Sequence, residues 1–397
     1  MQAVREDREE MPTVESGTSA VPRSVTNFFA VIAVTVILLV VLELVSFLAL
    51  RALRSSVFEE TPGKRILAAY QGQTWAPALA REEKAARQIY DYKPYIVWRS
   101  HPFHGETLNI DENGMRLTAH SHCDANQPTI WLFGGSTMRG NGSPDWGTIP
   151  SQLAELIEKS GQRACVRNFG EGAWVSTQEV TQLMLALKSE SRKPNFVIFY
   201  DGANDMYVPY QSGKADVHMN FDTIKNQFAG QRALRDGGFS YLLQTNTVQL
   251  VFSLVAKGAQ HEGDRPVPNP DLTGLAKASV NNYFANMDVV QGLAKQYGFD
   301  YAFFWQPVIY TSHKTLAGDE PQIKGSKKLA HLAAWVPQMY EDVSGQQRPH
   351  FYDLTNTFDR TNQTLFLDWC HITMGGNGLI AQKMFEVVRS AVGGGVN

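Results

Sequence analysis

Apolar runs and helical patterns alternate along most of this chain. Five short apolar runs, each suited to one buried strand, are separated by segments with helical periodicity; they span residues 129–133, 164–168, 195–200, 301–305 and 351–354. Strands that alternate with helices favour right-handed βαβ crossovers. We therefore predict an α/β fold with a mainly parallel, three-layer sheet in a domain that covers residues 126–397.

A longer apolar run lies near the N-terminus, at residues 28–50. At about 1.5 Å per residue it can cross a hydrocarbon layer about 30 Å thick. Arg51 and Arg54 follow it, instead of the small residues of a cleavage site. We predict an uncleaved transmembrane signal anchor in the lipid bilayer, preceded by a mobile polar tail at residues 1–27. For Glu43 we expect a protonated carboxyl or one that reaches the interface, rather than a contact with another helix.

Residues 51–125 connect the predicted anchor to the α/β domain. Residues 68–90 are rich in Ala, Glu, Arg and Lys and predict helix within a stalk. From residue 92 to residue 118 the pattern changes to β, with a first strand around residues 95–98 and a hairpin whose turn contains Asn113-Gly114. We expect this extension to pack at an edge of the main sheet.

The third and fourth apolar runs are separated by an insertion at about residues 211–297. It contains three helical patterns, near residues 221–233, 240–256 and 272–295. An insertion of this length exceeds a simple crossover and is typical of a lid or a substrate wall.

Composition excludes some classes of function. The formal net charge is -3 and there is no basic stripe, so we expect no nucleic-acid partner. The three cysteines do not form a disulfide framework; a bond between Cys123 and Cys165 is an alternative, but we expect free thiols. The His120-x-His122 pair next to Cys123 favours a surface loop over a metal site.

The first apolar run ends in Gly134-Gly135-Ser136, which places a hydroxyl where strand gives way to helix. Met138 excludes the nucleophile elbow of α/β-hydrolases, which needs glycine at that position. A serine needs an imidazole to take its proton and a carboxylate to orient that imidazole. Asp368-x-x-His371 near the C-terminus has the spacing to supply both from one loop.

Two more segments complete a recognisable order of motifs. They are the loop NFGEGAWVS, which starts at Asn168, and the tetrad Gly202-Ala203-Asn204-Asp205. Together with Ser136 and the C-terminal Asp and His, they resemble the four blocks of the SGNH, or GDSL, hydrolase family. The resemblance covers roughly residue 128 to the C-terminus, without most of the insertion. It implies a flavodoxin-like, five-stranded sheet with strand order 2-1-3-4-5.

The resemblance also implies roles for residues. Ser136, Asp368 and His371 would be catalytic, and the oxyanion donors would be the Ser136 amide, the amide at Ala173 and the Asn204 side chain. Two departures from the family pattern stand out: Gly135 replaces its acidic residue, and Ala173 replaces its glycine. Neither departure touches the nucleophile.

These residues predict a serine esterase that removes acyl groups, most simply O-acetyl, from an envelope or exported polysaccharide. No metal and no organic cofactor is expected. Trp174, Tyr207 and Trp369 are candidates for stacking on sugar rings, although packing is the commoner role of such aromatics. An O-acyltransferase with the same triad, or a non-catalytic scaffold that binds glycan or protein in a membrane-bound polysaccharide assembly, are the alternatives.

The location of the domain is not fixed by charge. Basic residues are slightly more frequent after the anchor than before it, which favours a cytoplasmic body, but large C-terminal domains translocate largely regardless of charge. The family resemblance favours an inner-membrane, single-pass protein whose catalytic domain is periplasmic.

Overall fold

The computed structural model describes residues 23–57, 61–87, 89–236, 245–251, 254, 272–326 and 330–393. Most of the predicted N-terminal tail and most of the helical pattern at residues 240–256 lie outside these residues. The chain divides into two compact units, one of Met1–Ser55 with Leu234–Leu254 and one of Ser56–Ala233 with Val255–Asn397.

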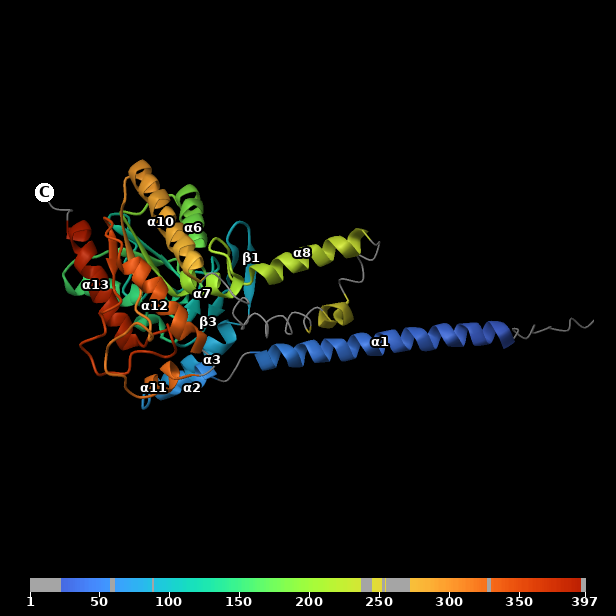
Figure 1. The fold of residues 1–397 in the computed structure, drawn as a ribbon. Coiled ribbons are helices and arrows are strands. Elements are labelled where there is room, and N and C mark those ends of the chain that lie inside the picture. Colours follow the sequence, from blue (N-terminus) through green and yellow to red (C-terminus); the bar gives the residue numbers. More distant parts are fainter. Residues whose placement is uncertain are drawn as a thin grey trace, which may run out of the picture. The chain divides into compact units, whose positions relative to one another are not determined.

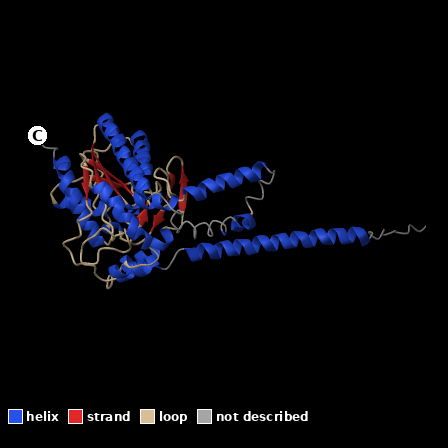
Figure 2. Cartoon of the chain, in the orientation of Figure 1, coloured by secondary structure: helices blue, strands red, loops and turns tan. Residues whose placement is uncertain are grey.

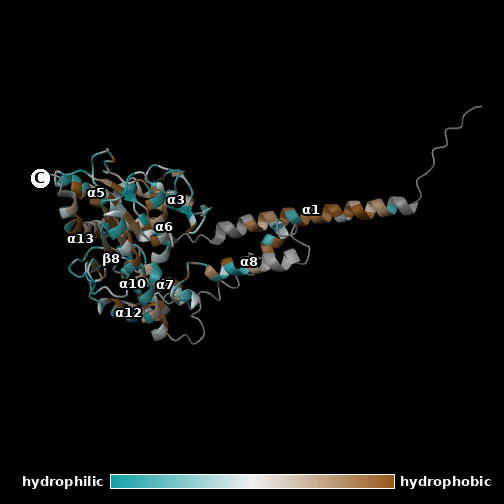
Figure 3. Ribbon diagram, turned by 90° about the horizontal axis from the view of Figure 1, so that it is seen from above, coloured by the Kyte–Doolittle hydropathy of each residue, from teal (hydrophilic) through white to brown (hydrophobic). Residues whose placement is uncertain are grey.

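The first unit is built on helix α1 (Arg23–Val57). Its segment Asn27–Leu50 is long and apolar enough to cross a membrane, and Figure 3 shows that most of α1 is hydrophobic. The expectation for Glu43 was wrong, because its carboxylate accepts hydrogen bonds from the backbone of Asn246 and Thr247. Residues 246–251 are helical, so Glu43 contacts the start of another helix.

The second unit contains a five-stranded, wholly parallel sheet in the order β6-β5-β7-β8-β9. In chain order its strands are β5 (Thr129–Gly134), β6 (Cys165–Asn168), β7 (Phe196–Asp201), β8 (Asp300–Trp305) and β9 (Phe351–Asp353). This confirms the predicted order 2-1-3-4-5. Every residue of β5 and β7 is buried, as expected for central strands with both faces covered (Figure 2).

Helices cover the sheet in two groups (Figure 1). One group pairs α5 (Ile149–Lys159) with α13 (Met374–Gly393). In the other, α10 (Leu272–Tyr297) packs against α6 (Ser176–Ser189), α7 (Ala203–Ser212) and α12 (Ala330–Ser344). The remaining described helices of this unit are α2 (Thr61–Ala69), α3 (Ala76–Ala86), α4 (Ser136–Arg139), η1 (Asp145–Gly147) and α11 (Glu320–Lys324), and α8 (Phe221–Asp236) belongs to it as far as Ala233.

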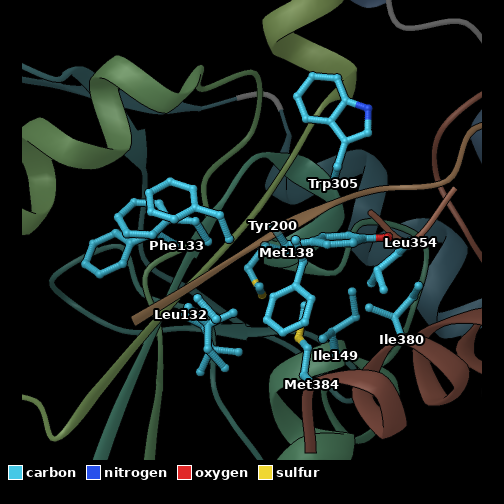
Figure 4. Packing of buried hydrophobic residues seen from close by; sticks show 14 of the residues in the cluster. Leu132, Phe133, Met138, Ile149, Tyr200, Trp305, Leu354, Ile380 and Met384 are labelled. Carbon is cyan, nitrogen blue, oxygen red and sulfur yellow. The ribbon is translucent and has the colours of Figure 1, made fainter. Parts of the chain in front are cut away.

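The core alternates along each strand. Leu132 points toward Ile149 and Met384, whereas Phe133 points to the other face of the sheet (Figure 4). On that face Phe133, Phe199 and Phe303, from three neighbouring strands, stack with ring centroids 5.3 Å and 4.3 Å apart. These separations are close to the ~4.8 Å spacing of paired strands, so one ladder of rings holds the centre of the sheet together.

The extension before the sheet forms two small antiparallel pairs. Strand β1 (Tyr90–Lys93) pairs with β2 (Val97–Ser100), and β3 (Phe103–His104) pairs with β4 (Asn109–Ile110). The Asn113-Gly114 turn is present, since Gly114 has a φ of 76° and its N–H donates to Asp111 O at 2.9 Å. After it, Arg116 bridges Asn168 of β6, which places the extension at an edge of the main sheet.

The expectation of free thiols was wrong for Cys123 and Cys165, which form a disulfide with a Cα–Cα distance of 4.3 Å. Residues 121–123 run beside the start of β6, where Ser121 Oγ lies 2.9 Å from both the N and the O of Val166. A spacing of 42 residues in the sequence gave no sign of this approach. Cys370 is a buried free thiol.

Candidate active site

The turn at the end of β5 presents Ser136. Gly135 is the N-cap of α4, so Ser136 begins that helix at the carboxyl edge of the sheet, where ligands bind in open parallel sheets. A Cβ atom on Gly135 would lie 2.3 Å from Asn204 Nδ2, which is closer than side chains approach. The absence of a side chain at position 135 therefore allows the serine and the amide of Asn204 to lie together.

His371 connects Ser136 to Asp368. Its Nε2 lies 2.7 Å from Ser136 Oγ, and its Nδ1 lies 2.7 Å from Asp368 Oδ2. Asp368 Oδ1 accepts hydrogen bonds from the backbone N–H groups of Cys370 and His371, at 3.0 Å and 2.8 Å. The contact with Asp368 favours a proton on Nδ1 of the neutral ring, so Nε2 is free to accept the proton of the serine hydroxyl.

The pKa values of two groups in this loop, the carboxyl of Asp368 and the thiol of Cys370, shift in opposite directions. Burial raises the pKa of Asp368, but His371 and the hydrogen bonds from the loop outweigh burial and hold that pKa well below its usual 3.8. Burial, with the charge of Asp368 beside it, raises the pKa of the Cys370 thiol well above its usual 9.0. The donor atoms of Asp368, Cys370 and His371 lie within 4.8 Å of one another, as a metal site would require, but Nδ1 of His371 is already paired with Asp368 Oδ2 at 2.7 Å.

Asn204 lies in the first turn of α7. Its Nδ2 donates a hydrogen bond to Trp174 O at 2.7 Å, which fixes the plane of the side-chain amide. The helix follows Gly202, whose φ of 132° is one that side chains rarely adopt. The second N–H of the amide can then face charge that develops beside Ser136.

Ala173 lies in the loop between β6 and α6 with a φ of 62°. This left-handed conformation costs a residue other than glycine about 1–2 kcal/mol. The backbone therefore has the shape that favours the family's glycine, although the chain has alanine there. The side chain of Ala173 is half-buried.

Strand β2 holds this loop through Glu171, which the sequence did not single out. Ser100 donates to the fully buried carboxylate of Glu171 twice, from its backbone N–H at 2.7 Å and from its Oγ at 2.8 Å. Arg139 Nε, one turn after Ser136, lies 3.7 Å from the same carboxylate. The strand donates two more hydrogen bonds to backbone oxygens of the loop, from Arg99 Nη1 to Phe169 at 2.8 Å and from Trp98 Nε1 to Gly172 at 2.9 Å.

Buried carboxyls fix the other end of the loop. Asp205 Oδ1 accepts hydrogen bonds from the N–H and the Oγ of Ser176, at 3.0 Å and 2.6 Å. Burial raises the pKa of Asp205 to about 6 and that of Asp201 to about 8. Burial also raises the pKa of Glu179 well above its usual 4.5, and the charge of the nearby Asp201 raises it further.

The three aromatic candidates differ in their exposure. The ring of Trp174 is fully buried, with Arg99 Cζ 5.0 Å from its centroid, so this candidate has the packing role and is not available to stack on a sugar. Tyr207 and Trp369 are partly buried and their rings lie 6.0 Å apart. The sequence could not separate these cases because all three residues flank motifs of the site.

No family model and no curated protein matches this chain. Solved structures align with it at low identity. They include an acetyl xylan esterase (15% identity, 66% of this chain and 99% of that chain, TM-score 0.31), a lipolytic protein of the G-D-S-L family from Veillonella parvula (12%, 66% and 98%, 0.32) and a psychrotrophic esterase from Pseudoalteromonas (11%, 66% and 98%, 0.30). With TM-scores of this size, the resemblance to SGNH hydrolases rests on the sheet order and on the contacts of the four motifs.

Proposed function

We propose that this chain is a membrane-anchored serine esterase of the SGNH type that acts through an acyl-serine intermediate. The observation that carries the proposal is the continuous contact from Ser136 through His371 to Asp368 at the carboxyl edge of the sheet. The neighbouring amide of Asn204 supports it, because ester hydrolysis needs a donor where negative charge develops.

The mechanism follows from this arrangement. Ser136 Oγ attacks the ester carbonyl as its proton passes to Nε2 of His371, and Asp368 stabilises the resulting imidazolium. The N–H groups of Ser136 and Ala173, with the amide of Asn204, would bind the oxyanion. His371 then gives the proton to the departing alcohol, and water, activated by the same ring, releases the acid and restores the serine.

We propose an O-acetylated polysaccharide of the cell envelope, or one in export, as the substrate. An anchor helix would keep the enzyme near such a polymer, and the partly exposed pair of Tyr207 and Trp369 could stack on its sugar rings. The disulfide between Cys123 and Cys165 supports a periplasmic catalytic domain on the inner membrane, since such bonds persist mainly in oxidising compartments.

Catalysis is tested with Ser136→Ala and with Ser189→Ala, which changes an exposed serine at the end of α6. In the purified full-length chain, Ser136→Ala should lower the hydrolysis of aryl acetates at least about 10³-fold, and Ser189→Ala should leave it unchanged. Equal rates for wild type and Ser136→Ala would show that the site is not catalytic. With an acetylated glycan as acceptor, acyl transfer in excess of acid release would replace the esterase by an acyltransferase.

Topology is tested by labelling Tyr297→Cys, an exposed position on α10. Labelling of the protein's own cysteines should be low, because Cys123 and Cys165 form a disulfide and Cys370 is buried. A thiol reagent that cannot cross the inner membrane should label this variant in cells with a permeabilised outer membrane. Labelling only after the inner membrane is disrupted would place the domain in the cytoplasm.

A further inference from the structure

Glu43 is a charged residue inside an apolar span. It lies two helical turns before Leu50, the last residue of that span, which corresponds to a depth of about 10 Å in a hydrocarbon layer about 30 Å thick. An unpaired carboxylate at such a depth is costly, so a side chain of this kind in a membrane helix normally has a polar partner.

The first unit of the structure supplies that partner. The two carboxylate oxygens of Glu43 accept hydrogen bonds from the backbone N–H groups of Asn246 at 2.7 Å and Thr247 at 3.1 Å. These amides begin the helical residues 246–251, and the first amides of a helix have no acceptor within it. The carboxylate and the helix start thus satisfy each other, with the sign of charge that a helix N-terminus favours.

A second contact lies on the same face of α1. Ser46 Oγ is 3.2 Å from Thr247 Oγ1, and Ser46 is only 2% exposed although its chain neighbours Val45 and Phe47 are 55% and 46% exposed. Glu43, Ser46 and Leu50 are three and four residues apart, a spacing that places them on one side of a helix. Leu50 is also buried, at 6% exposure, so a continuous stripe of α1 is covered.

The covering segment has the composition of a lipid-facing element. Val251 and Leu254 are 55% and 50% exposed in the chain, which leaves apolar surface outward. In the sequence no residue between Asp236 and Lys257 is charged, a run as long as those that enter bilayers. The polar residues of this run include Asn246 and Thr247, whose backbone N–H groups bind Glu43.

We infer that residues 245–251 and Leu254 dock on α1 inside the hydrocarbon layer, with Glu43 and Ser46 as their polar contacts and lipid acyl chains as their outer partner. The segment lies beside the C-terminal end of the α1 span, at the leaflet from which the chain continues toward the catalytic unit. This part of the insertion, predicted from the sequence as part of a lid or wall, is a second membrane-embedded element.

Immersion in lipid is tested with Val251→Cys, and Tyr297→Cys serves as the control on the catalytic unit. The full-length variants are reconstituted into phosphatidylcholine–phosphatidylglycerol bilayers, under conditions in which the reagent reaches both faces of the bilayer. A charged maleimide is then added. Val251→Cys should react at least about tenfold more slowly than Tyr297→Cys, and both should react fully in denaturant. Because Val251 is open within the protein, similar rates for the two variants would overturn lipid immersion.

Docking on α1 is tested with the pair Ser46→Cys and Thr247→Cys in the same bilayers. Mild oxidation should join the two cysteines, as detected by mass spectrometry of the linked peptides. Glu43→Gln, which keeps an acceptor oxygen, should preserve the cross-link, and Glu43→Leu should reduce it several-fold without changing the thermal unfolding of the catalytic unit. The proposed docking would be overturned if the cysteine pair gave no cross-link while Glu43 is retained. Equal cross-link yields with Glu43 and with Glu43→Leu would overturn it as well.

Discussion

Gly135→Ala tests whether the absence of a side chain beside Ser136 is what allows Asn204 to serve the site. The new Cβ would lie 2.3 Å from Asn204 Nδ2, whereas ordinary contacts begin at 3.4 Å. The amide must therefore move by about 1 Å, and a displacement of that size can lower a rate about 10²-fold. Loss of one oxyanion donor lowers kcat about 10² to 10³-fold, so we expect a loss in that range with little change in KM.

The assay is the steady-state hydrolysis of an aryl acetate by the purified full-length chain. Gly292→Ala is a matched control, since nothing lies within 4 Å of a Cβ at this position of α10 and kcat should not change. Asn204→Ala alone should lower kcat by about 10² to 10³-fold.

The double variant separates the mechanism from general damage. Once Asn204 is alanine, the next group near the added Cβ is Trp174 O at 3.5 Å, an ordinary contact. Gly135→Ala should then cost almost nothing further, so the two losses should not add. Additive losses in the double variant would refute the reasoning, because Gly135→Ala would be acting elsewhere.

Three further predictions concern stability. Ala173→Gly should raise the free energy of unfolding by up to about 1 kcal/mol, because it relieves the φ of 62°, and should leave kcat within a few-fold. Burial raises the pKa of Asp201 to about 8 from 3.8, so the folded chain retains a proton that the unfolded chain releases. The free energy of unfolding should therefore fall by up to about 1.4 kcal/mol per pH unit between pH 5 and 8. In Asp201→Asn it should fall less steeply over the same range. Replacing Cys123 and Cys165 by alanine should lower the free energy of unfolding by about 2–4 kcal/mol.

Each of these predictions has a control in chemical denaturation. Ala285→Gly, at an exposed position inside α10, should destabilise by about 1 kcal/mol, and the same sign at Ala173 would contradict the strain argument. An unchanged pH slope in Asp201→Asn would assign the dependence to another group. Reductant should destabilise the wild type and leave the cysteine double variant unaffected; equal effects would contradict a stabilising disulfide.

The sequence predicts the sheet well because its central strands are buried on both faces. Such strands appear as continuous apolar runs, and β5 and β7 were found from this signal alone. The catalytic contacts were foreseen for a different reason. Asp368 and His371 lie in one short loop, so their approach depends on local geometry, whereas their approach to Ser136 required the fold that the order of motifs implied.

The features that the sequence did not reveal depend on contacts between distant segments. In the sequence Glu171 is an ordinary loop glutamate, and only its contact with Ser100 of strand β2 shows its role. The disulfide likewise forms because residues 121–123 lie beside β6. Trp174 likewise packs against a distant residue, since Arg99 Cζ lies 5.0 Å from the centroid of its ring. In each case the deciding partner is 42 or more residues away, beyond the reach of periodicity or turn chemistry.

The hydrogen bonds between strand β2 and the loop around Glu171 determine where the chain can be truncated to give a stable fragment. A fragment that begins at Pro128 would keep all five strands and every catalytic side chain, yet it would lose Ser100 and leave the carboxylate of Glu171 buried without its main donors. The smallest fragment suited to crystallisation therefore begins before Tyr90. By the same contacts, exchanging the extension between related proteins would alter turnover while every residue that touches the substrate stayed in place.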